Sequence, residues 1–172
     1  MSDLQIREAT PEDAASYRAH MLRIYDEADV DIPFTPDEYP RTVEQDASNI
    51  ATYRDADNSL FLVAVTPENE VVGSIRLYGG RIKAVQHVAD LALYVNAEYR
   101  DQAVGSRLMK IGLDWAHSSG IIKRVQLEVY ARNTRAIRVY EKYGFVKEGH
   151  RQRSMFQKGE YLDEYLMALL ID

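Results

Sequence analysis

Hydrophobic and polar residues follow two different periods along the first third of the chain. Alternation over residues 4–7 predicts a strand, and Thr10-Pro11-Glu12-Asp13 then supplies a cap, a first-turn proline and first-turn acids for a helix. This helix is predicted to reach about Asp29, because apolar side chains recur in it at helical spacing: Ala14, Tyr17, Met21, Ile24 and Tyr25. Three prolines between residues 33 and 40 interrupt the pattern, and a polar helix is predicted over residues 41–55.

The rest of the chain mixes strand-like and helix-like stretches. Two β-rich runs, 60–66 and 71–78, flank the turn residues 67–70 and predict a hairpin, and a third run covers 86–95. Helices are predicted over 105–117 and 133–143, with strands over 124–130, near 145 and over 162–169. This order predicts one α/β layered domain over residues 1–172 with a mixed sheet.

Composition narrows the classes of function. The 172 residues are 46% hydrophobic and 28% charged, as in an ordinary globular domain. There is no cysteine, which excludes disulfides, thiolate metal sites and a covalent cysteine nucleophile. The net charge of −6 argues against nucleic acid and favours an amine or another cationic partner. Neither a signal peptide nor an apolar run of about 18 residues occurs, so we expect a cytoplasmic protein that does not enter a membrane.

The junction between the third β-run and the helix after it could hold an anion. Residues 96–109 read NAEYRDQAVGSRLM, so small residues and an arginine stand where the first amides of a helix lack intrahelical acceptors. Many such turns hold one glycine and one arginine without binding a ligand, and the junction alone does not decide between the two interpretations. It matches neither of the familiar glycine-rich nucleotide loops, which disfavours an NTPase or a dinucleotide enzyme.

The helix over residues 133–143 presents one arc of apolar and aromatic side chains. Asn133 and Tyr140 lie on this arc, and Gly144 follows the helix as a residue past its cap. Periodicity alone favours a structural interpretation, in which Tyr140 is a core aromatic residue and Asn133 caps the helix.

Two segments together, residues 87–109 and 127–149, closely resemble the GCN5-related N-acetyltransferase (GNAT) superfamily. The superfamily's R/Q-x-x-G-x-G/A loop reads R-D-Q-A-V-G over residues 100–105, and its N-x-x-A-x-x-x-Y-x-x-x-G-F pattern is met in full by Asn133, Ala136, Tyr140, Gly144 and Phe145. The resemblance implies a mixed, mostly antiparallel sheet of about six to seven strands, about four flanking helices and a central β-loop-α site for acetyl-coenzyme A.

The resemblance also implies roles for individual residues. The backbone of Leu93, Tyr94 and Val95 would pair with the pantetheine arm. The pyrophosphate would be held by the loop residues Arg100, Asp101, Gln102, Ala103, Val104, Gly105 and Ser106. Asn133 would contact the cofactor arm, and Tyr140 would give a proton to the departing sulfur. Ala103 replaces the first glycine of the family loop, so an unusual backbone dihedral there would weaken phosphate binding by about 1 kcal/mol.

Two further sites are needed, one for a base and one for the acceptor. An ammonium acceptor must lose a proton before it attacks, and Asp90 and Glu128 are the candidate catalytic bases, with His87 a third. The alternative interpretation is that Asp90 and Glu128 are solvated charges at a strand edge. The acceptor pocket is expected at Tyr25, Asp29, Phe34, Tyr161 and Asp163, although aromatic residues at such places more often serve packing. No metal-ligand spacing accompanies these residues, and we expect no metal.

The resemblance therefore predicts an acetyl-CoA-dependent N-acetyltransferase that acts on a primary amine of a small molecule, such as an amino acid or a polyamine. A protein or peptide N-acetyltransferase and a non-catalytic acetyl-CoA sensor remain open. Many members of the superfamily pair as dimers, so a homodimer is a further expectation.

Overall fold

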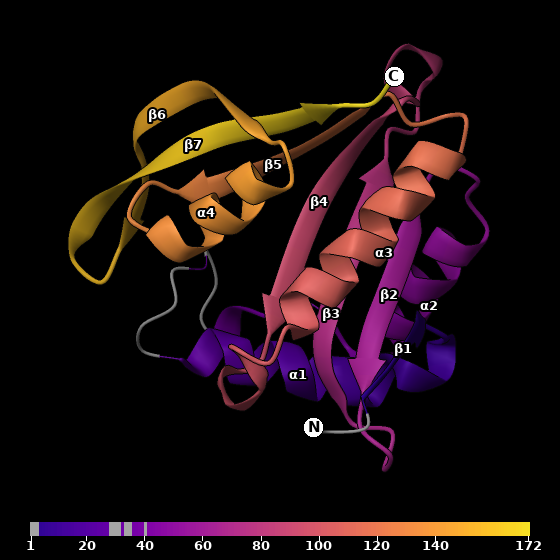
Figure 1. Ribbon diagram of the computed structural model, residues 1–172. Helices are drawn as coiled ribbons and strands as arrows, with labels where there is room; N and C mark the ends of the chain where they lie inside the picture. Colours follow the sequence, from indigo (N-terminus) through magenta and orange to yellow (C-terminus); the bar gives the residue numbers. More distant parts are fainter. Residues whose placement is uncertain (1–3, 28–31, 33–35, 40) are drawn as a thin grey trace.

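A computed structural model describes residues 4–27, 32, 36–39 and 41–172. These residues form a seven-stranded sheet in the order β1-β2-β3-β4-β5-β7-β6 (Figure 1). The strands are β1 (Gln5–Glu8), β2 (Leu60–Val65), β3 (Val71–Gly79), β4 (Val88–Val95), β5 (Arg124–Tyr130), β6 (Val146–Gln157) and β7 (Glu160–Leu170). Every neighbouring pair is antiparallel except β4 and β5. The mixed, mostly antiparallel sheet predicted from the sequence is confirmed.

Four α-helices flank the sheet (Figure 1). Helices α1 (Ala14–Asp26) and α2 (Val43–Arg54) cover one face, while α3 (Val104–Ser118) and α4 (Thr134–Lys142) lie on the other. Helix α1 ends three residues before the predicted Asp29, since Glu27 already has an extended backbone with φ −69° and ψ 123°. The ends of α2 and α3 lie within two residues of their predicted positions.

Each face of the sheet has its own hydrophobic core. On the α3 face, Ile75 and Leu77 of β3 are fully buried against Leu108 and Met109. On the α1 face, an aromatic cluster packs against β2, with the rings of Tyr17 and Tyr53 edge-on to Phe61 at 5.0 and 5.2 Å between centroids. Burying a side chain of this size contributes about 1.5–3 kcal/mol. The two cores hold β3 and β4 at the centre of the sheet.

Strands β4 and β5 separate after a short parallel pairing. They are in register only from Val88 with Arg124 to Asp90 with Gln126. Beyond that point β4 stays paired with β3, and β5 stays paired with β7. The connection through α3 is the kind of crossover that parallel neighbours require. As a result, the second half of β4 has a strand partner on one side only, and the sheet opens between β4 and β5 (Figure 1).

Strands β6 and β7 form a hairpin that is longer than predicted. The strands have 12 and 11 residues, whereas the sequence predicted a strand near residue 145 and one over 162–169. Polar residues dominate β6 from His150 to Arg153, so a hydrophobic period could not reveal it. Over the part of the chain that the structure describes, none of the helices combines the length and the apolar composition needed to cross a membrane.

Candidate functional site

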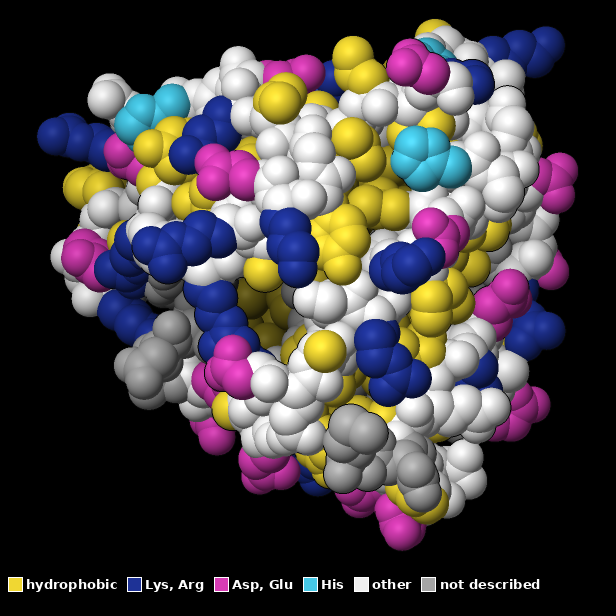
Figure 2. Space-filling model, in the orientation of Figure 1, with side chains coloured by type: hydrophobic (Ala, Val, Ile, Leu, Met, Phe, Trp, Pro, Cys, Tyr) yellow, Lys and Arg dark blue, Asp and Glu magenta, His cyan; other side chains and the backbone are white. Residues whose placement is uncertain are grey.

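A cleft of about 1750 Å³ opens where β4 and β5 part. Residues 90–95 of β4, residues 126–130 of β5, the start of α3 and the inner side of α4 line it. Figure 2 shows a hollow with hydrophobic side chains on its floor and Lys and Arg side chains around its rim. A long ligand with an apolar arm and a charged end would fit both properties.

The backbone of β4 faces this cleft at alternate residues. The carbonyl of His87 accepts from Lys123 and Arg124 on the β5 side, whereas the amide of Asn96 donates to Val72 of β3 at 2.9 Å. Because the N–H and C=O groups of a strand residue point to the same side and alternate along the strand, those of Leu93 and Val95 point into the cleft. The backbone of Tyr94 faces β3. Of the three predicted pantetheine contacts, Leu93 and Val95 present polar groups to a ligand.

The loop before α3 contains two residues with a left-handed backbone. Asp101 has φ 59° and Ala103, which caps α3, has φ 61° and ψ 9°. The amide of Arg107 donates to the carbonyl of Ala103 at 2.9 Å, so the amides of residues 104–106 precede the first intrahelical bond. Three N–H groups and the positive end of the α3 dipole therefore point out of the helix start, a geometry suited to a phosphate.

Arg100 anchors this loop to its neighbours. Its Nε donates to the carbonyl of Val95 at 2.9 Å, and its Nη2 lies 2.6 Å from a carboxylate oxygen of Glu27 at the end of α1. Gln102 donates to the carbonyl of Glu98, and Asp101 pairs with Arg135 of α4 at 2.9 Å. The charge of Arg100 is thus shared with Glu27, and the backbone amides are the main donors that the loop offers to an anion.

Tyr140 is enclosed on the α4 side of the cleft. The residue is only 8% exposed, and its ring centroid lies 5.8 Å from that of Phe145. Burial, with a smaller contribution from the phenol of Tyr94, raises the pKa of Tyr140 well above its ordinary value. Its hydroxyl therefore carries a proton at neutral pH and can donate it. Asn133 caps α4 by accepting from the amide of Ala136 at 3.1 Å, and it also lines the cleft.

The two candidate bases line the cleft but have polar partners. Asp90 is exposed and accepts from Gln126 at 2.8 Å. Glu128 pairs with Arg151 at 2.7 Å. Arg151 also lies 2.9 Å from Glu164, a buried carboxylate of β7 that the sequence analysis missed. The role of Asp90 and Glu128 as bases stays a prediction.

The predicted acceptor residues fall into three groups. Tyr25 is half-buried on the α1 face, and its ring centroid lies 5.6 Å from that of Tyr39. Tyr161 is 63% exposed, and Asp163 accepts from His150 at 2.9 Å and from the amide of Arg153 at 2.8 Å. Neither Tyr161 nor Asp163 lines the cleft, although Glu164 and Leu166 of the same strand do. Asp29 and Phe34 lie outside the described residues.

Two polar residues on the α1 face were not singled out from the sequence. His20 of α1 is buried between the side-chain oxygens of Asn96 at 2.6 Å and Ser74 at 3.1 Å. Burial lowers the pKa of His20 to about 4, so it is neutral and holds α1 against the end of β4. Arg76 lies in the middle of β3, directly opposite Ala92 of β4. A charged residue inside an otherwise apolar strand is the sequence signal that could have drawn attention to it.

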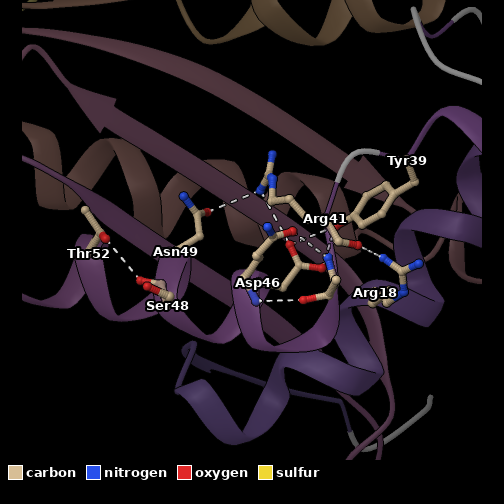
Figure 3. A network of polar contacts seen from close by, with 9 residues as sticks. Arg18, Tyr39, Arg41, Asp46, Ser48, Asn49 and Thr52 are labelled. Carbon is tan, nitrogen blue, oxygen red and sulfur yellow. Dashed lines mark hydrogen bonds and ion pairs between the residues drawn. The ribbon is translucent and has the colours of Figure 1, made fainter.

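A polar network holds Tyr39 and Arg41 against α1 and α2 (Figure 3). The hydroxyl of Tyr39 donates to both carboxylate oxygens of Asp46 at 2.9 and 2.8 Å, and Arg41 lies 3.5 Å from the same group. Arg18 of α1 donates to the carbonyl of Arg41, and its guanidinium carbon lies 4.8 Å from the centre of the Tyr39 ring. The network fixes Tyr39, and through ring contact Tyr25, on the side of the sheet where Arg76 lies.

Solved structures share this architecture over nearly the whole chain. An acetyltransferase of the GNAT family from Streptococcus pneumoniae superposes with a TM-score of 0.92 at 34% identity, covering 98% of this chain and 100% of that one. The structure of yncA from Salmonella typhimurium, described as a putative acetyltransferase with its cofactor acetyl-CoA, has a TM-score of 0.83 at 18% identity and covers 99% and 95%. At 18% identity, the similarity to yncA shows a shared fold and nothing more.

Curated relatives match a shorter stretch of sequence. The L-amino acid N-acetyltransferase AaaT of Escherichia coli is 33% identical over 101 residues, which cover 59% of this chain and 62% of the relative. Spermidine N(1)-acetyltransferase of Vibrio cholerae is 25% identical over 103 residues, which cover 60% and 58%. The chain therefore aligns with about three fifths of the length of each of these two relatives.

Residues 21–145 match the family described as Acetyltransferase (GNAT) family. That segment contains the end of α1, the β4 edge, the loop with Ala103, α3, β5 and α4, which provide most of the residues that line the cleft. The chain belongs to the GNAT family of acetyltransferases.

Proposed function

We propose that this protein transfers the acetyl group of acetyl-coenzyme A directly to a primary amine of a small molecule. The observation that supports this most is the opening between β4 and β5, with the polar backbone groups of Leu93 and Val95 on one wall and the start of α3 at its end. Membership of the acetyltransferase family supports the same reaction. The names of the two curated relatives, an amino-acid and a spermidine acetyltransferase, support a small amine as acceptor.

Each wall of the cleft has a separate task in this proposal. The unpaired amides at the start of α3 hold the pyrophosphate, because they add several N–H contacts to the field of the helix dipole. The β4 backbone pairs with the amide groups of the pantetheine arm as a neighbouring strand would. Of the cleft-lining arginines, Arg138 is exposed on α4 and has no ion pair among the described residues, so it is available to a phosphate.

Transfer then removes two protons from the acceptor ammonium and supplies one to the leaving sulfur. The amine nitrogen, once deprotonated, attacks the thioester carbon and forms the new C–N bond, and the C–S bond breaks. The leaving sulfur takes its proton from the Tyr140 hydroxyl, whose raised pKa keeps it protonated until that moment. The first ammonium proton passes to Asp90, Glu128 or a water bound to them before the attack, and the second, lost as the tetrahedral adduct collapses, restores the Tyr140 phenol. The tetrahedral oxygen gains stability from N–H donors that are already in place.

The test is release of free coenzyme A, detected with a thiol-reactive dye, in the presence of a panel of amines. The panel holds the twenty amino acids, spermidine, and short peptides with free N-termini or lysines. Release with amino acids or spermidine is the expected result. Release with peptides alone would replace the small-amine acceptor by a protein acceptor. Tight acetyl-CoA binding with no release for any amine would leave a sensor in place of an enzyme.

A further inference from the structure

Arg76 carries a positive charge on the α1 face of the sheet, next to the cleft. Its neighbours two residues away show which face it uses: Ser74 contacts His20 of α1, and the Tyr78 ring lies 5.4 Å from that of Tyr53 in α2. The residue as a whole is half-buried, but its Nε is shut off from solvent and has no hydrogen-bond partner. Such an atom is uncommon, because a buried donor without an acceptor costs about 1–3 kcal/mol.

Neutral phenols, not carboxylates, surround this guanidinium. After burial, the largest electrostatic influences on the Arg76 guanidinium come from the hydroxyls of four tyrosines: Tyr17, Tyr53, Tyr94 and Tyr25. Burial disfavours the charged form of Arg76, but the four phenols together outweigh this effect and raise the pKa of Arg76 above its ordinary value. Arg76 therefore stays positive at every working pH. Among the residues that the structure describes, no carboxylate forms an ion pair with Arg76.

Asp46 is a buried acid on the same face, but it is already occupied. Tyr39 donates to both of its oxygens and Arg41 pairs with it (Figure 3). Buried charges in proteins are normally paired, because desolvation of a lone charge is costly. Within the described part of the chain, the surroundings of Arg76 thus supply hydrogen-bonding groups but no counter-charge, which suits an anionic ligand.

The position of Arg76 connects it to the reacting end of the cleft. It is in register with Ala92, a small residue of β4 that lines the cleft, and the strands are about 4.8 Å apart, a distance that an arginine side chain spans. Tyr94 lies two residues after Ala92, so its side chain is on the same face of β4, and it also lines the cleft. A ligand held at Arg76 therefore lies on the face of β4 that carries Tyr94, in the cleft that Tyr140 also lines.

We propose that Arg76 binds a carboxylate of the acceptor, so that the acceptors of this enzyme are amines that carry a carboxylate close to the nitrogen, as amino acids do. The inference rests on the proposed N-acetyltransferase function and specifies its substrate class. A polyamine is disfavoured at this place, because its cationic nitrogens would face a guanidinium that none of the described acidic residues pairs with. Arg76 acts on specificity and positioning and takes no part in the proton transfers.

The test compares acceptors that differ only in the carboxylate. The best amino acid of the panel is assayed beside its own carboxamide and beside spermidine. We expect the wild-type kcat/KM for the acid to exceed that for the amide by about tenfold or more. The amide has the less basic nitrogen and more free amine at neutral pH, so amine ionisation alone would favour the amide.

Variants of Arg76 separate recognition from folding. Arg76→Met is expected to lower kcat/KM for the acid by roughly 10- to 100-fold, mainly through KM, and to change that for the amide by less than about threefold. Arg76→Lys keeps the charge and should recover part of the loss. The matched control is Arg81→Met, which removes an exposed arginine from the ring of Tyr78 and should leave both values unchanged. Acetyl-CoA affinity should be the same in all four proteins.

The possible outcomes are distinct. A wild-type acid-to-amide ratio of one or less, or a preference for spermidine, overturns the carboxylate site and leaves the acetyltransferase intact, and this result needs no variant to fold. Absence of coenzyme A release with every amine rejects the proposed function instead. In that case calorimetry with the amino acids in the presence of coenzyme A still decides the site: heat with wild type that is lost in Arg76→Met supports it, and its absence in wild type rejects it.

Discussion

Ala103 offers a quantitative test of the loop geometry. It has φ 61° and ψ 9°, and an L-residue in this conformation loses about 1–2 kcal/mol relative to the right-handed region. Glycine is free of this cost, but it makes the unfolded chain more flexible by about 0.4–1 kcal/mol. Ala103→Gly should therefore stabilise the protein by roughly 0.5–1 kcal/mol. For a 172-residue chain this raises Tm by about 1–4 °C.

The assay is thermal unfolding of the ligand-free protein, followed by circular dichroism. The matched control is the same substitution at Ala19, which is exposed within α1, where glycine costs about 1 kcal/mol and should lower Tm by about 2–4 °C. Opposite signs for the two variants are the prediction. If Ala103→Gly lowers Tm as much as Ala19→Gly does, the left-handed backbone at residue 103 is refuted.

Ala103→Gly also answers whether the missing glycine weakens cofactor binding. Since alanine already adopts the left-handed conformation, the amides of residues 104–106 are in place without glycine. Acetyl-CoA affinity should change by less than about threefold, and a tenfold gain would mean that the ligand-bound loop has another conformation.

Three further predictions concern the proton donor, the loop anchor and the buried histidine. Tyr140→Phe should lower kcat by about 100-fold or more with little change in acetyl-CoA affinity. The control Tyr143→Phe loses only its hydrogen bond to the carbonyl of Ser106 and should keep kcat within about threefold. Equal losses of kcat and affinity in Tyr140→Phe would contradict the assignment of Tyr140 as the proton donor. Arg100→Glu should weaken acetyl-CoA binding in a salt-dependent way, because it places a second carboxylate beside Glu27 at the end of α1. Calorimetry at low and high salt measures this effect. Weakening that does not depend on salt would point to distortion of the loop alone. The pKa of His20 is lowered to about 4 in the folded protein, against about 6.5 when unfolded, so between these pH values the unfolded state binds one more proton than the folded state. The free energy of unfolding should therefore fall by on the order of 3 kcal/mol as pH drops from 6.5 to 4. Urea titrations should show this dependence on pH, reduced in His20→Gln, and the same dependence in both proteins would contradict the prediction.

The order of elements was predictable because most of them have a clear hydrophobic period. Strand β5 begins and ends at the predicted residues, and α3 has one apolar stripe that faces β3. The β6–β7 hairpin was underestimated because its outer strand is mostly solvated, so its pairing, and not its pattern, defines its length. The end of α1 was misplaced because the ion pair of Glu27 with Arg100 is a long-range contact with no local signal.

The candidate site was predictable where a motif encodes backbone geometry. The loop and the Tyr140 helix both border the cleft, as the resemblance to the GNAT superfamily implied. The acceptor side was harder to predict. Asp163 and Glu164 are neighbours in β7, yet only Glu164 lines the cleft, because successive strand residues point to opposite faces. Arg76 belongs to no motif. Its role can be inferred only from the tyrosines around it, which come from three other elements of the fold.

Amide hydrogen exchange with and without acetyl-coenzyme A tests the proposed binding mode most directly. Slower exchange is predicted at the cleft-facing amides of Leu93 and Val95 and at the amides of residues 104–106, with no change at Tyr94, whose amide already pairs with β3. Binding that protects none of these amides, or no binding at millimolar acetyl-coenzyme A, would contradict the assignment of the β4–β5 opening as the cofactor site.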